Sequence, residues 1–139
     1  MKRRDLILEK NRPYHIVVRA VERRTIFPSE EERARFAVQM YVANVGIPVN
    51  LNRQNVKVAS AALLQGQTIS SSIMVQKHDP LVTFFSFALV GNHYHFGLIG
   101  SFDGAISKYL QKLNIGFSKF FNLKHRRNGS LFDTRFKAI

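Results

Sequence analysis

The chain has 139 residues, a length that suits a single domain, and 45% of its residues are hydrophobic, which is enough for a packed core. It has no cysteine, so disulfides, thiolate metal sites and cysteine nucleophiles are excluded. No run of about 18 apolar residues and no apolar segment after the charged start is present. We therefore expect no membrane span, no secretion signal and a cytoplasmic location.

Positive charge is concentrated at the two ends of the sequence. The formal net charge is +12, and residues 1–24 carry eight Lys or Arg against three acids. Residues 106–139 carry eight Lys or Arg against one acid. Segregated positive charge of this size is typical of proteins that bind nucleic acids. The simpler interpretation is a solvated basic surface with weak affinity for any polyanion.

A strand and a helix are the first elements that the sequence predicts. Residues 14–20 are rich in β-branched side chains, which is typical of a strand. Ser29 stands three residues before Glu32, the spacing of a capping box at a helix start. Apolar residues at helical spacing then predict a helix to about Asn44, and Gly46 is expected to close it.

The middle of the chain predicts a helix, a loop and a hairpin. Residues 53–65 suit a second helix, and residues 67–79 are polar and irregular, as in a loop. Residues 81–90 form an apolar β-type run, and residues 93–99 alternate in polarity after the turn Gly91-Asn92. This pattern predicts two antiparallel strands joined by a short turn.

A long amphipathic helix is predicted next, with Asp103 as its N-cap and its end near Leu123. A short strand is expected over residues 131–136. The order strand, helices, hairpin, helix predicts an α+β fold in which helices pack on one face of an antiparallel sheet, of the ferredoxin-like or RRM-like type.

His93 and His95 are the leading candidates for a chemical site. On a strand, residues two apart share one face, with Cα atoms roughly 6.6 Å apart, so both imidazoles can reach one metal ion. Two imidazoles leave a metal under-coordinated. His15, His78 and His125 are available as a third ligand, and the spacing does not select one of them. The simpler interpretation is a pair of polar surface residues.

The segment Phe87-Ala88-Leu89-Val90-Gly91-Asn92-His93-Tyr94-His95-Phe96 resembles the signature of HUH-type single-tyrosine transposases. It is most similar to the REP-associated tyrosine transposase branch (IS200-like), whose pattern reads φ-x-φ-Met-Pro-Asn-His-φ-His-φ. Residues 14–27 resemble that family's opening strand and basic turn, and residues 121–137 resemble its Phe-Asn … Arg-x-Gly-x-Leu-Phe-x-x-Arg-Phe-Lys segment. Here Val90-Gly91 replaces the usual Met-Pro, and residues 46–79 look like an insertion in the single domain 1–139.

The resemblance implies a function and a cofactor. It implies a domain that binds single-stranded or hairpin DNA in the cytoplasm of a prokaryote, in association with the nucleoid, and it allows a homodimer. It implies a divalent metal, Mg or Mn, held by His93, His95 and one amide side chain. It also implies DNA cleavage and strand transfer by a tyrosine hydroxyl that forms a 5′-phosphotyrosine. Imidazole ligands by themselves favour zinc or nickel.

The predicted DNA-binding residues share a positive charge and lie near the first strand or near the end of the chain. They are Arg3, Arg4, Arg19, Arg23, Arg24, Lys124, Arg126, Arg127, Arg135 and Lys137. Tyr14, Phe96 or Phe132 could stack on unpaired bases, although each also suits the core.

The attacking tyrosine is the part of the family pattern that the sequence does not supply. In the REP-associated branch it lies in a helix beyond the Arg-Phe-Lys segment, and this chain stops soon after that segment. Tyr94 is expected to face away from the histidines, and Tyr109 is a weak candidate that suits a core role better. The alternatives are therefore a transposase domain without its nucleophile, a non-catalytic domesticated module that binds hairpin or single-stranded nucleic acid, and an RNA-binding fold with a fortuitous His-x-His pair.

Overall fold

The computed structural model describes residues 7–45, 79–133 and 136–139. Its elements, in chain order, are β1 (Pro13–Arg19), the short 3-10 helix η2 (Val21–Arg23), α1 (Glu30–Val45), β2 (Val82–Val90), β3 (His93–Gly100), α3 (Ala105–His125) and β4 (Lys137–Ala138). The predicted first strand, first helix, hairpin and long helix are confirmed. The predicted helix at 53–65, the insertion as far as residue 78 and the helix stop at Gly46 lie outside the described residues.

The four strands form one antiparallel sheet in the order β2-β3-β1-β4. Helix α1 follows β1 and precedes β2, and these two strands flank β3. Helix α3 joins β3 to β4, and these two strands flank β1. This split β-α-β arrangement is the ferredoxin-like topology. The predicted α+β class, with helices packed on an antiparallel sheet, is confirmed.

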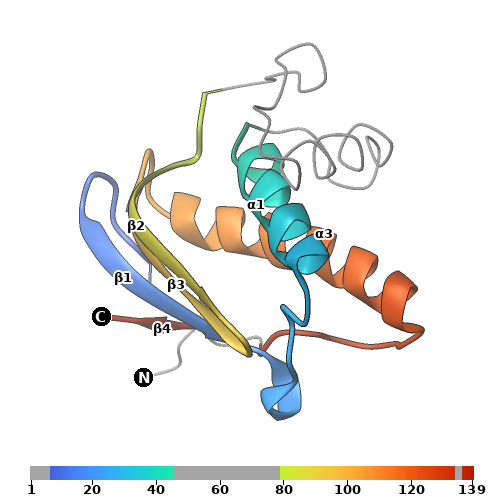
Figure 1. Cartoon of the computed structure of the whole chain (residues 1–139). Coiled ribbons are helices and arrows are strands. Elements are labelled where there is room, and N and C mark those ends of the chain that lie inside the picture. The colour runs from blue at the N-terminus through green and yellow to red at the C-terminus, as the bar shows by residue number, and fades with distance from the viewer. Residues whose placement is uncertain (1–6, 46–78, 134–135) are drawn as a thin grey trace.

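Both helices lie on the same side of the sheet, as Figure 1 shows. The core between the layers is aromatic: the Phe36 ring contacts Tyr94 and Phe96 of β3 and Phe117 of α3, with centroids 5.0–6.3 Å apart. These four side chains are fully buried. Because strand residues alternate between faces, the burial of Tyr94 and Phe96 directs their neighbours to the opposite face, which no described helix covers.

Asn44 ties the end of α1 to the start of β2. Its side-chain amide donates to the Val82 carbonyl at 3.0 Å, and its oxygen accepts from the Val82 amide at 2.9 Å. This pair of contacts fixes the end of α1 against the start of β2. Within the described part of the chain, no helix is both long and apolar enough to cross a membrane.

Two local predictions are wrong. Asp103 does not cap α3; its Oδ1 accepts a hydrogen bond from the Lys10 amide at 2.7 Å, and the N-cap is Gly104, which has a φ of 84°. Residues 131–133 form no strand; Leu131 and Phe132 are buried, and Phe132 makes a single bridge with Ala20. The last strand begins later, at Lys137, where the chain pairs with the free edge of β1.

Candidate functional site

The face of the sheet opposite the helices carries the two histidines of the His-x-His pair. Tyr94, between them, is buried in the core, so His93 and His95 project together from the other face. Their ring centroids are 4.9 Å apart. The prediction that they share one face is confirmed, and both side chains are only partly buried.

A third imidazole on β1 lies next to this pair. In the β1–β3 register, Val17 lies opposite His95 and His15 lies opposite Gly97, so His15 is a diagonal neighbour of His95. The His15 Nε2 and His95 Nδ1 atoms are 3.4 Å apart. Of the histidines considered as a third ligand, His15 lies next to the pair in the structure. Its position follows from the pairing of β1 with β3, two strands that are far apart in the sequence.

The environment of His93 keeps its ring in the form that can bind a metal. Its Nδ1 lies 2.7 Å from the Asn92 Oδ1, and the tautomer that donates from Nδ1 to this oxygen has its lone pair on Nε2. Partial burial, followed by the charges of His95 and Arg19, lowers the pKa of His93. A lowered pKa favours the neutral imidazole, which is the metal-binding form.

Positive charge flanks the three imidazoles. Arg19, which is exposed, lies opposite His93 on β1, and Lys137 of β4 lies opposite Val17. None of the four strands contains an Asp or Glu residue. The face defined by His15, His93, His95, Arg19 and Lys137, called the histidine face below, therefore carries positive charge without an acid in its strands.

An exposed aromatic ring borders the histidine face. Phe85 lies at the bulge between Phe84 and Ser86 of β2, is 56% exposed, and its ring occupies the space that a side chain at Gly97 would need. The sequence pattern did not indicate this exposed ring, because the bulge interrupts the alternation of β2. The aromatic residues predicted to stack on bases are placed differently: Phe96 and Phe132 are buried, and Tyr14 packs against the core.

Two of the predicted DNA-binding cations have partners inside the protein. Lys124 lies 2.8 Å from Glu32 and also contacts Glu31, while Arg127 donates to the Asn122 side chain at 2.6 Å. Arg23, Arg24 and Arg126 are exposed, Arg23 and Arg24 just after β1 and Arg126 at the end of α3. Arg3, Arg4 and Arg135 lie outside the described residues.

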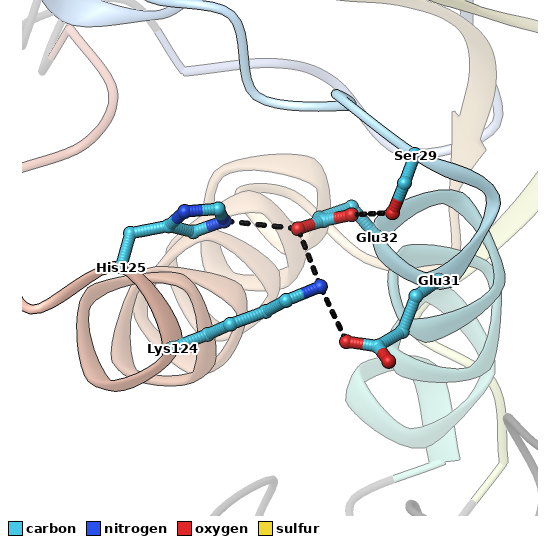
Figure 2. A network of polar contacts seen from close by, with 5 residues as sticks. All are labelled: Ser29, Glu31, Glu32, Lys124 and His125. Atoms are coloured by element: carbon cyan, nitrogen blue, oxygen red, sulfur yellow. Dashed lines mark hydrogen bonds and ion pairs between the residues drawn. The ribbon is translucent and has the colours of Figure 1, made fainter.

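Glu32 is the centre of a polar network between the start of α1 and the end of α3, drawn in Figure 2. Its carboxylate, 1% exposed, contacts the Ser29 hydroxyl, Lys124 and, at 2.9 Å, the His125 Nε2. Burial raises the pKa of Glu32, but the hydrogen bonds from Lys124, Ser29 and His125 outweigh it and hold that pKa at about 2. The Ser29–Glu32 pair thus makes a side-chain contact that takes part in the packing of α1 against α3, and His125 lies in the helix layer, away from the histidine face.

All four tyrosines of the chain lie away from the histidine face. Tyr94 and Tyr109 are fully buried and donate to Asn114 and to the Met40 carbonyl, and burial raises the pKa of both hydroxyls. Tyr14 accepts from the Glu9 amide and packs against the core. Tyr41 is 43% exposed but belongs to α1, in the helix layer. The core role expected for Tyr109 is confirmed.

Imidazole nitrogens are the groups of the histidine face whose chemistry suits a metal ion. Among the residues that the structure describes, no group of three or more His, Asp or Glu is placed to hold a metal ion together. The His15 Nε2 and His95 Nδ1 atoms, 3.4 Å apart, are in hydrogen-bond contact with each other. Imidazole nitrogens are chemically suited to a divalent cation, which would need further ligands, such as water or phosphate oxygens, to complete its coordination.

No model of a known protein family matches the chain. A search of curated proteins likewise finds no match.

Proposed function

We propose that this chain is a DNA-binding domain of the HUH transposase type, which binds single-stranded or hairpin DNA across the histidine face. The observation that supports the proposal is the gathering of three imidazoles and two cations, Arg19 and Lys137, on one sheet face whose strands contain no acid. A phosphodiester chain is the partner that this combination suits, because it presents repeated negative charge and oxygen ligands for a cation.

The residues of the histidine face have separate roles in this proposal. Arg19 and Lys137 contact phosphates and set the register of the strand, and Phe85 offers an exposed ring for an unpaired base. His93 and His95 would hold a divalent cation, with magnesium or manganese implied by the resemblance. When bound, such an ion supplies Lewis-acid polarisation of a phosphate oxygen.

Charge removal on the histidine face is expected to weaken DNA binding in a salt-dependent way. The change is the double variant Arg19→Ala/Lys137→Ala, and the probe is a fluorescent DNA hairpin with a single-stranded tail, followed by anisotropy at several salt concentrations. Because each lost contact with a single strand removes about 0.7 from the salt slope, the plot of log K against log salt should become shallower by about 1.4.

The matched control is Lys108→Ala/Lys119→Ala, which removes the same charge from exposed positions on α3, in the helix layer. Its salt slope should stay close to that of the unchanged chain. Equal losses of affinity and slope in the two double variants would mean that only net charge matters, and would exclude the histidine face as the binding surface.

The second candidate is a non-catalytic module that binds the same nucleic acids. The observation that favours it is the placement of all four tyrosines away from the histidine face, two of them fully buried. Cleavage through a tyrosine would then need a hydroxyl other than those of the four tyrosines in this chain.

The two candidates differ in one product. Incubating the chain with a labelled hairpin oligonucleotide and manganese, then separating under denaturing conditions, should give no covalent protein–DNA adduct, because no tyrosine reaches the histidine face. An adduct that disappears in His93→Ala and His95→Ala would instead establish cleavage by this chain and rule out the non-catalytic module. The same probe as RNA, bound with equal affinity and without response to metal, would favour an RNA-binding fold.

A further inference from the structure

We propose that a cavity between α3 and the C-terminal segment holds one unpaired base of the DNA strand that crosses the histidine face. The proposal rests on the proposed DNA-binding function and deepens it, because it adds recognition of a base to the contacts with phosphates. Phosphate contacts position a nucleic acid, whereas contacts with bases distinguish one sequence from another.

The cavity is large enough for a base and has apolar walls. Its volume is about 550 Å³, within the range of about 300–1,000 Å³ typical of pockets that hold small organic ligands. The C-terminal segment returns from the end of α3 towards β4, as Figure 1 shows, and forms one side of the cavity. The apolar lining consists of Leu110, Ile115, Phe132 and Phe136. Apolar and aromatic walls suit the flat faces of a base, which stack on aromatic rings in proteins that bind single strands.

The polar lining supplies hydrogen-bonding groups for the edge of a base. It comes from successive turns of α3 and includes Ser107, Gln111, Asn114 and Ser118. The Asn114 Oδ1 accepts from the buried Tyr94 hydroxyl at 2.6 Å, which fixes the orientation of the carboxamide. Among the described residues its NH₂ group has no partner, so it can donate to a ring nitrogen or carbonyl oxygen. Carboxamides are among the side chains that recognise base edges.

Gln111 and Lys119 show how the cavity meets solvent. Both line it and both are exposed, so a base can enter from the surface. Gln111 offers a second carboxamide, with a donor and an acceptor. A base is uncharged, so the proposal assigns no role to the charge of Lys119.

The edge strand β4 separates the cavity from the histidine face. Lys137, the first residue of β4, pairs with Val17, which also pairs with His95, so these three residues share one face. Phe136, the preceding residue, lines the cavity and packs against the core between sheet and helices. Consecutive residues at the sheet edge thus border the two sites. A strand whose phosphate contacts Lys137 passes around a two-residue edge strand to place a base in the cavity.

A scan for the contribution of each base tests the proposal. The full chain is titrated, with anisotropy as the readout, into hairpins whose single-stranded tails consist of each of the four bases in turn. The tail that binds most tightly is then made in a series that lacks one base at a time, while the stem fixes the register. We expect binding to weaken about tenfold when the base in the cavity is missing, which is the typical effect of losing one stacked base.

Filling the cavity identifies the position that it holds. In Ser118→Phe, the affinity should no longer depend on the base at that position, while a position that stacks on Phe85 keeps its effect. Ala37→Phe, which adds the same ring at an exposed position of α1 outside the cavity, is the matched control and should give the scan of the unchanged chain.

A second measurement needs no substitution. In NMR spectra of the unchanged chain, the side-chain amide signals of Asn114 should shift with the intact hairpin and stay in place with the hairpin that lacks the sensitive base. Equal losses at all tail positions, a scan unaltered in Ser118→Phe, or Asn114 signals that no hairpin shifts would each overturn the proposal while leaving DNA binding itself intact. No binding of any hairpin would refute the DNA-binding function, and the base site with it.

Discussion

Replacing Phe117 with alanine is expected to lower the free energy of unfolding by about 4 kcal/mol, the typical cost of emptying a buried phenylalanine site. Phe117 is fully buried, and its ring lies 5.0 Å from that of Phe36 and 5.8 Å from that of Phe27. It also approaches Phe132 of the C-terminal segment, at 6.2 Å. The Phe117 ring therefore contacts side chains of both helices and of the C-terminal segment. Urea unfolding followed by circular dichroism measures the decrease in the free energy of unfolding.

The matched control is Phe87→Ala, which removes an identical side chain from β2 where it is 61% exposed. Its unfolding free energy should change by less than about 0.5 kcal/mol, the usual range for exposed sites. A change in Phe117→Ala no larger than that of the control would show that the aromatic core is not packed as described.

Replacing Glu32 with alanine is expected to cost about 2 kcal/mol of stability. Removing one partner of a fully buried ion pair costs about 3–5 kcal/mol, and the cost here is smaller because water solvates the partners that remain. Glu32 is 1% exposed, whereas the side chains of Lys124 and His125 are 34% and 33% exposed. Glu31→Ala, which removes a half-exposed carboxylate from the same lysine, is the control and should change stability by less than about 1 kcal/mol.

The same carboxylate makes stability depend on pH. The pKa of Glu32 is about 2 in the folded chain against an ordinary value of 4.5, so the unfolded chain takes up the proton first as pH falls. The stabilisation by Glu32 is therefore complete above about pH 4.5 and is lost as the pH falls towards 2. Between these values, the unfolding free energy of Glu32→Gln should fall less steeply than that of the unchanged chain. Parallel curves for the two proteins would contradict the assignment.

The local sequence pattern was enough to predict most of the helices and strands, and to predict two of the three histidines of the histidine face. The alternation of residues 93–99 predicts that His93 and His95 share a face, and the structure agrees because side-chain direction on a strand is a local property. The spacing of apolar residues likewise predicted α1 and α3. The buried residues of α3 follow the predicted stripe, whereas α1 also buries the polar residues Glu32, Arg35 and Gln39.

Contacts between distant segments account for what the sequence did not predict. His15 joins the histidines only through the pairing of β1 with β3, 80 residues further along the chain. Lys124, expected on DNA, turns to Glu32 because α3 packs against α1. Phe85 is exposed because it lies at a β-bulge. A bulge moves the residues that follow it to the opposite face of the strand, and the alternation of polar and apolar residues in the sequence does not reveal it.

The arrangement of the strands has a consequence for motion. His15 and His95 belong to the two strands that have hydrogen-bonded neighbours on both sides, whereas β2 and β4 form the edges of the sheet. Amide protons of doubly paired strands exchange with solvent only in the rarest openings of a protein, and those at edges exchange through local fraying. The backbone amides of the two strands that carry the imidazoles are thus expected to exchange most slowly. The edge strands can adjust to a bound polymer while the spacing of the imidazoles is preserved.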